Sequence, residues 1–128
     1  MSINRTILSA GLPIRAMLLG NAELGKMVTK IYPLFVKEAT LPYIVYNRVS
    51  LMQDVTKSGG ADTANIDVDC YAASYEESIK IAEIVRSTLE FQTGEQDGVR
   101  IRRCFLVDST EAYADDAFLQ RLRFQVKI

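Results

Sequence analysis

The chain has 128 residues, of which 48% are hydrophobic and 24% charged, a composition typical of a folded globular protein with one core. Its 15 basic and 16 acidic residues give a net charge of −1, which argues against a protein that works mainly by neutralising phosphates. With no histidine and two cysteines, it excludes a four-ligand structural zinc site and every nucleophile activated by histidine. We therefore expect a single domain over residues 1–128, with no cofactor, no metal and no enzymatic activity.

The first part of the chain predicts short helices. Residues 3–19 carry apolar side chains at near-helical spacing, but Gly11 and Pro13 interrupt them, which predicts one kinked helix or two short ones. Asn21 is a good N-cap and predicts a further short helix that ends near Gly25.

Three extended segments follow. Residues 31–35 read as a strand that Pro33 confines to the edge of a sheet. Residues 43–49 are dense in β-branched and aromatic side chains and predict a second strand. A polar loop over residues 53–62 precedes the third strand and is the best candidate for mobility. In the third strand an apolar face alternates with an acidic one; the apolar residues are Ala64, Ile66, Val68 and Cys70.

The second half predicts a helix and two strands. Ser74 and Glu77 form a capping box, and the helix runs to about Phe91. A turn over residues 93–98 leads to a strand over residues 99–109. The alternation in that strand places Val99, Ile101, Arg103, Phe105 and Val107 on one face. An acidic connection over residues 111–116 leads to a last strand whose inward face carries Phe118, Gln120, Leu122, Phe124, Val126 and Ile128.

The element order α-β-β-β-α-β-β predicts the α+β class: an antiparallel or mixed sheet of four to five strands with helices packed on one face. The matching periodicities predict which side chains form the core between the sheet and the long helix. They are Ile66, Val68, Leu122, Phe124 and Val126 on strands, and Ile81, Ile84, Val85 and Leu89 on the helix.

Targeting signals are absent from the sequence. The N-terminus lacks the apolar segment and cleavage site of a secretory signal, and no apolar run approaches the ~20 residues needed to span a bilayer. We expect a protein made in the cytosol without a membrane anchor, with Cys70 and Cys104 as reduced, half-buried thiols.

Two acidic residues on one strand face are the strongest candidate for chemistry. Asp67 and Asp69 are two positions apart, so their carboxylates should point the same way, roughly 7 Å apart. Such a pair can bind a divalent cation or act as acid and base. The interpretation that we favour is the solvated face of a half-buried strand. The pair Gly59-Gly60 is too short for a phosphate loop.

Basic residues gather on two predicted strands: Arg100, Arg102 and Arg103 on one, and Arg121, Arg123 and Lys127 on one face of the other. One explanation for these residues is a small nucleic-acid-binding α+β module, but the sequence lacks the aromatic and glycine signature of a sheet that stacks bases. Acidic and basic strips also orient neighbouring subunits, and we favour this second role. We expect no specific nucleic-acid binding.

Four segments in order give a more specific indication. They are IYP at residues 31–33, LPYIVYNR at 41–48, IDVDCYA at 66–72 followed by the helix over 75–89, and LQRLRFQV at 119–126. Nearly the whole chain thereby resembles the small tail completion proteins of long-tailed phages and prophages. The resemblance implies a structural role without catalytic residues. It also implies location in the virion tail after assembly in the host cytoplasm.

The resemblance further implies a ring, commonly a hexamer, at the head-proximal end of the tail. Such a ring stops tube polymerisation and contacts the tail tube and the head connector. A connector or neck subunit is the alternative within the same class. Loops and charged strips are expected to carry the contacts. The candidate assembly surface consists of Lys57, Ser58, Gly59, Gly60, Asp67, Asp69, Arg121, Arg123 and Lys127.

Overall fold

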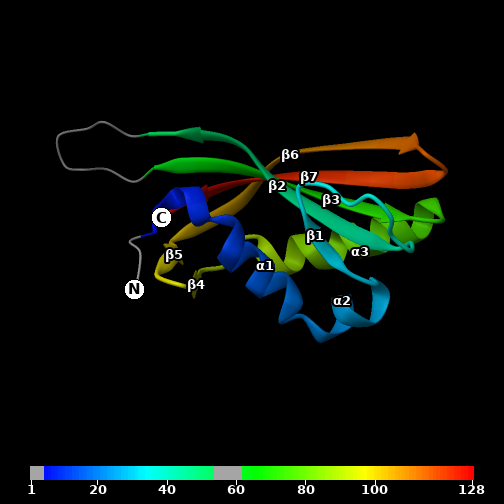
Figure 1. The fold of residues 1–128 in the computed structure, drawn as a ribbon, viewed down its shortest axis with the longest axis horizontal. Helices are drawn as coiled ribbons and strands as arrows, with labels where there is room; N and C mark the ends of the chain where they lie inside the picture. Colours follow the sequence, from blue (N-terminus) through cyan, green and yellow to red (C-terminus); the bar gives the residue numbers. More distant parts are fainter. Residues whose placement is uncertain (1–4, 54–61) are drawn as a thin grey trace.

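The structure is a computed structural model that describes residues 5–53 and 62–128 (Figure 1). Five strands form one sheet in the order β1-β2-β3-β7-β6. Their bounds are β1 Ile31–Pro33, β2 Tyr43–Met52, β3 Thr63–Ala72, β6 Arg103–Ala114 and β7 Ala117–Lys127. β1 runs parallel to β2 and every other pairing is antiparallel, so the sheet is mixed. This confirms the predicted α+β class.

The helices α1 (Gly11–Leu19), α2 (Ala22–Met27) and α3 (Tyr75–Leu89) cover one face of the sheet and leave the other uncovered (Figure 1). A short 3₁₀ helix, η1 (Ile7–Ser9), precedes α1. The predicted interruption is therefore confirmed: the chain forms two short pieces. Pro13 is the third residue of α1, in the first turn, where a missing N–H breaks no helical hydrogen bond.

Side-chain caps begin the other two helices. The Asn21 side chain accepts a hydrogen bond from the Leu24 N–H at 2.9 Å, and α2 then continues through Gly25 to Met27, two residues beyond the predicted end. The Ser74 hydroxyl accepts from the Glu77 N–H at 3.2 Å, as the capping box predicts. α3 ends at Leu89, before the predicted Phe91.

The core lies between the helices and the inward face of the sheet. All of the predicted core residues belong to it, with Ile84 partly buried and the others fully so. Phe124 is the largest completely buried side chain. It lies opposite Ile66 on β3 and Leu106 on β6. Cys70 and Cys104 are free thiols, buried rather than half-buried as predicted.

Residues 93–116 depart from the prediction. The expected turn and single strand form a hairpin of β4 (Gly94–Gln96) and β5 (Val99–Ile101), then a bend at Arg102, and only then β6. The bend shifts the alternation by one residue, so Cys104 is buried while Arg103 is exposed. Periodicity could not reveal the break because Val99 and Ile101 are apolar as a strand requires, but they belong to the small hairpin.

The predicted acidic connection is also wrong. Residues 111–114 continue β6, and the turn consists of Asp115 and Asp116 alone. Both have positive φ, 53° and 62°, which suits the two-residue turns that match strand twist and which aspartate tolerates better than most residues. We predicted a loop because this segment is acidic. On the edge strand β6, however, acidic side chains can point into solvent while the backbone pairs with β7.

Candidate assembly surface

The uncovered face of the sheet carries a ladder of ion pairs between β3 and β7. The register places Asp67 opposite Arg123 and Asp69 opposite Arg121. Arg121 donates from Nε and Nη2 to the two Asp69 carboxylate oxygens at 2.8 and 3.0 Å. Arg123 donates to Asp67 in the same way at 2.7 and 3.1 Å. This bidentate geometry is the strong form of the contact.

The ladder corrects the expectation that the two aspartates are solvated. Asp67 is 4% exposed and Asp69 6%, because the arginine side chains lie over them on the neighbouring strand. Hydrogen bonding to Asp69 raises the pKa of Arg121, and hydrogen bonding to Asp67 raises that of Arg123. The four side chains are paired with one another, so the two aspartates neutralise the positive charge of the two guanidinium groups on this face.

No cluster of three or more metal-ligating side chains occurs within residues 5–53 and 62–128. None of the helices in these ranges is long and apolar enough to cross a membrane.

The remaining residues of the predicted assembly surface lie outside the ladder. Lys127 lies at the end of β7, opposite Thr63 and Arg103. Lys57, Ser58, Gly59 and Gly60 fall outside the described residues.

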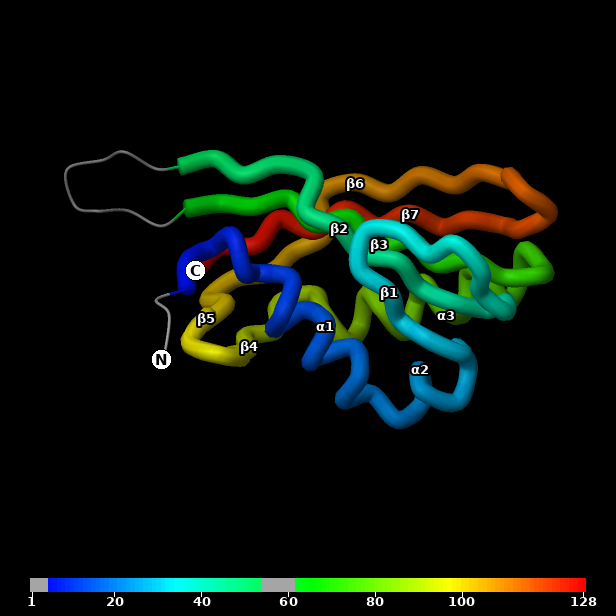
Figure 2. The backbone as a smooth tube through the Cα atoms, in the orientation of Figure 1, coloured from blue at the N-terminus to red at the C-terminus, as the bar shows by residue number. Residues whose placement is uncertain are grey.

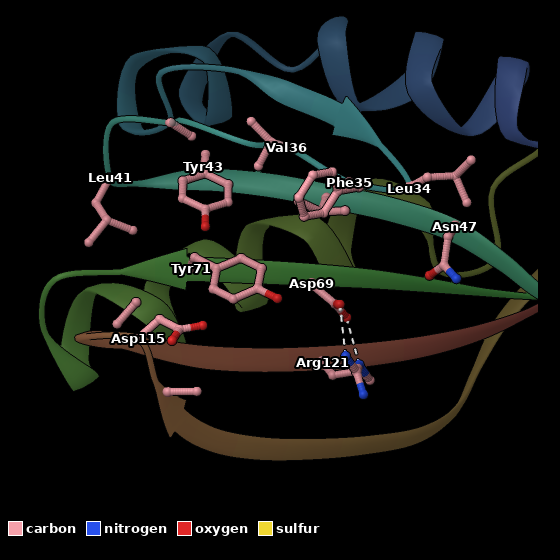
Figure 3. A pocket seen from close by; sticks show the side chains of 14 residues that line it. Leu34, Phe35, Val36, Leu41, Tyr43, Asn47, Asp69, Tyr71, Asp115 and Arg121 are labelled. Atoms are coloured by element: carbon pink, nitrogen blue, oxygen red, sulfur yellow. Dashed lines mark hydrogen bonds and ion pairs between the residues drawn. The ribbon is translucent and has the colours of Figure 1, made fainter.

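Beside the ladder is a groove of about 490 Å³ that sequence reasoning did not identify (Figure 3). Its floor is the stacked pair Tyr43 and Tyr71, whose ring centroids are 4.9 Å apart. We call it the tyrosine groove, and its principal lining residues are Leu34, Phe35, Tyr43, Tyr71 and Asp115. One wall comes from the loop after β1 and the other from the tip of the β6–β7 hairpin.

Electrostatics in the groove come from Asp115 and from burial. Burial, and next the Asp115 carboxylate, raise the pKa of Tyr43. Burial, and next Asp69, raise the pKa of Tyr71. Asp69 is paired with Arg121 inside the groove, so Asp115 supplies the unbalanced negative charge of the lining.

The lip of the groove is apolar and exposed. Residues 31–35 were expected to be one extended segment, but β1 ends at Pro33 and the chain turns at Leu34, whose φ is 60°. The Phe35 N–H donates to the Pro33 carbonyl at 2.6 Å and closes a γ-turn of the rarer, strained kind. Leu34 is 73% exposed and Phe35 77%. The only sequence signal was two apolar residues directly after a proline.

Comparison with known proteins places this fold in a family. The profile described as Tail completion protein gp17 matches residues 13–128. One solved chain, from the structure titled "Virion of native gene transfer agent (GTA) particle", is similar with a TM-score of 0.79. It is 16% identical, over 92% of this chain and 95% of that one, so the likeness is one of fold. No curated protein sequence matches the chain. The match over residues 13–128 means that this chain belongs to the tail completion protein gp17 family.

Proposed function

We propose that the protein closes the head-proximal end of a phage tail as a ring, stops growth of the tail tube and helps to join the tail to the head. The observation that carries the proposal is the family match over residues 13–128. The fold shared with a chain of a gene transfer agent virion is in keeping with it. We infer a structural role in the virion tail, without catalysis, as one domain over residues 1–128.

The sheet offers two different edges for a closing, head-to-tail ring. β6 is one outer strand, and residues 103 and 107–114 along it are exposed. At the other edge, β1 pairs only with Ile44 to Tyr46, so no described strand lies beside residues 47–52 of β2 on that side. Contacts between unlike surfaces generate rings when the rotation closes. The resemblance of the sequence to phage proteins makes six copies the expected number.

The ion-pair ladder suits an assembly surface because it is rigid and nearly neutral. Ordering two arginine side chains before binding reduces the entropy lost on association. We infer that Asp67, Asp69, Arg121, Arg123 and Lys127 present this surface to a neighbouring copy, the tail tube or the head connector. That residues 57–60 also belong to the assembly surface stays a prediction.

Deletion of the gene from the phage or prophage that encodes the chain tests the proposed function. Electron microscopy of the lysate should reveal overlong tails or tails not joined to heads, and complementation should restore joined particles. Tails of normal length on heads after deletion would contradict the structural role.

Location within the particle separates the terminator from the alternative of a connector or neck subunit. A terminator is expected to co-purify with headless tails, because it closes the tube before joining. A connector is expected to remain with tailless heads. Immunogold labelling of both intermediates distinguishes them. The nucleic-acid module is disfavoured because Arg121 and Arg123 are engaged by aspartates.

A further inference from the structure

Phe91 follows Glu90, the C-cap of α3, and is 78% exposed, the most exposed large hydrophobic residue that the structure describes. Its φ is 63°, and its N–H donates to the Cys104 carbonyl at 2.6 Å. A bulky residue with positive φ is uncommon, and glycine is the usual residue at this end of a helix. Neither the backbone conformation nor burial of the ring explains a phenylalanine here, which points to a contact outside the subunit.

Two arginines lie on one side of this phenylalanine. Arg102 and Arg103 line the same depression as Phe91, and both are exposed. Neither guanidinium makes an ion pair within the described part of the chain, in contrast to Arg121 and Arg123 in the ladder. We call Phe91, Arg102 and Arg103 the Phe91 patch. It is aromatic at its centre and positively charged on the side of Arg102 and Arg103. On its other side, Phe91 borders a depression lined by Glu83, Arg86 and Glu90, where Arg86 pairs with Glu90.

The tyrosine groove has the complementary properties. Its floor is aromatic, its lip holds the exposed and strained Leu34 together with Phe35, and its unbalanced charge is the negative Asp115. Its volume of about 490 Å³ lies within the ~300–1,000 Å³ typical of sites that enclose small ligands. A phenyl ring in it meets aromatic partners, and an arginine beside that ring meets a carboxylate and tyrosine faces.

The patch and the groove lie on different surfaces. The patch is at the β6 edge, since the Phe91 N–H donates to the carbonyl of Cys104, the second residue of β6. The groove is lined by side chains of the uncovered face, and part of its apolar wall comes from residues 34–41. These residues lie in the loop between β1 and β2, at the opposite edge of the sheet (Figure 2). One subunit cannot bring its own patch into its own groove, whereas a second copy rotated about a ring axis can. We propose that the Phe91 patch of one copy occupies the tyrosine groove of the next copy.

This inference rests on the proposed ring and specifies its contact. One aromatic ring and two charges form a small interface, so association is expected to be weak in dilute solution and to become complete where copies are concentrated on the end of a tube. The apolar lip is exposed in the free subunit, and in the proposed ring the next copy would bury it.

Crosslinking between introduced cysteines tests the contact. Phe91→Cys and Phe35→Cys each place one thiol on the patch or in the groove. The native Cys70 and Cys104 are buried and do not compete. With a short bismaleimide at millimolar protein concentration, the double variant should form a series of covalent oligomers of increasing size. A mixture of the two single variants should stop at dimers, and each single variant alone should remain monomeric, because like surfaces do not meet.

The second measurement is Phe91→Gly in the full chain. Glycine relieves the positive φ and removes only an exposed ring, so the thermal midpoint should stay equal or rise. Self-association measured by sedimentation should weaken roughly tenfold or more, as for an interface aromatic. Leu19→Ala, which changes an exposed residue of α1, should leave association unchanged.

If the wild type forms oligomers but the double variant gives no series of crosslinked oligomers, this contact is rejected and the proposed ring is left intact. A wild type that does not oligomerise at millimolar concentration, together with a double variant that forms no crosslinked oligomers, would also reject it. The gene-deletion experiment decides the proposed function in either case. Unchanged association of Phe91→Gly, where the wild type associates, would equally overturn the inference.

Discussion

Replacing Arg121 with methionine removes the guanidinium that donates two hydrogen bonds to Asp69 and keeps most of the aliphatic side chain. Exposed ion pairs contribute about 0–1 kcal/mol, and breaking a fully buried pair costs about 3–5 kcal/mol. Here Asp69 is 6% exposed while the Arg121 side chain is 42% exposed, so one partner remains hydrated. We therefore expect a loss of about 2 kcal/mol in the free energy of unfolding.

For 128 residues, an unfolding entropy of about 2.1 cal/mol/K per residue converts that loss into a fall of about 7 °C in Tm. Urea and thermal unfolding of the wild type, Arg121→Met, Asp69→Asn and the double variant give a double-mutant cycle. The double variant should lose less than the sum of the single variants, because removing both partners leaves no unpaired buried charge.

Lys80→Met is the matched control. Lys80 forms a 3.8 Å pair with Glu76 on α3, with both side chains largely exposed, and its removal should have no measurable effect. If Arg121→Met lowers the free energy of unfolding no more than Lys80→Met does, each pair in the ladder is an ordinary surface ion pair. The argument that it makes the sheet face rigid would then be wrong.

Three further outcomes are expected. Phe124→Ala should cost about 3–5 kcal/mol in urea unfolding, because it deletes the largest completely buried side chain; a loss under about 1 kcal/mol would contradict its place in the core. Ser74→Ala should cost about 1 kcal/mol by removing the acceptor for the Glu77 N–H; an unchanged urea midpoint would count against the cap. Burial raises the pKa of Cys104 to about 12 and that of Cys70 as well, so at about pH 8 neither thiol should react with a thiol reagent until the protein unfolds. Rapid labelling of either thiol in the native protein would refute this.

The sequence predicts best where one periodicity applies to a whole element. β3 and β7 alternate strictly, and α3 has a cap and a single apolar face, so their existence and inward residues could be predicted, although α3 ends two residues before the predicted Phe91. Prediction failed at Arg102, where the chain bends within a basic segment that has no glycine or proline. It failed also at Leu34, because Pro33 was interpreted as confining an edge strand and not as its end. The bend and the γ-turn are set by tertiary contacts that a local pattern does not contain.

The candidate surface was predicted in part. The spacing of Asp67 and Asp69 indicated a shared face, and the arginines of the last strand indicated a basic strip. That β3 and β7 are neighbours in exact register is a property of topology, so the burial of the aspartates could not be foreseen. The tyrosine groove was missed because Tyr43 and Tyr71 come from different strands and Asp115 from a hairpin tip.

The place of β7 between β3 and β6 has a consequence during synthesis. Ala117 follows Ala72 by 45 residues, so at about 5–20 residues per second β3 waits roughly 2–9 s for its partner on the ribosome. During that time its apolar alternation invites pairing with the same strand of another nascent chain. In-register or neighbouring antiparallel pairing would set Asp67 and Asp69 against like charges, which is unfavourable. The two aspartates thus discourage premature association until Arg121 and Arg123 emerge and neutralise them within their own chain.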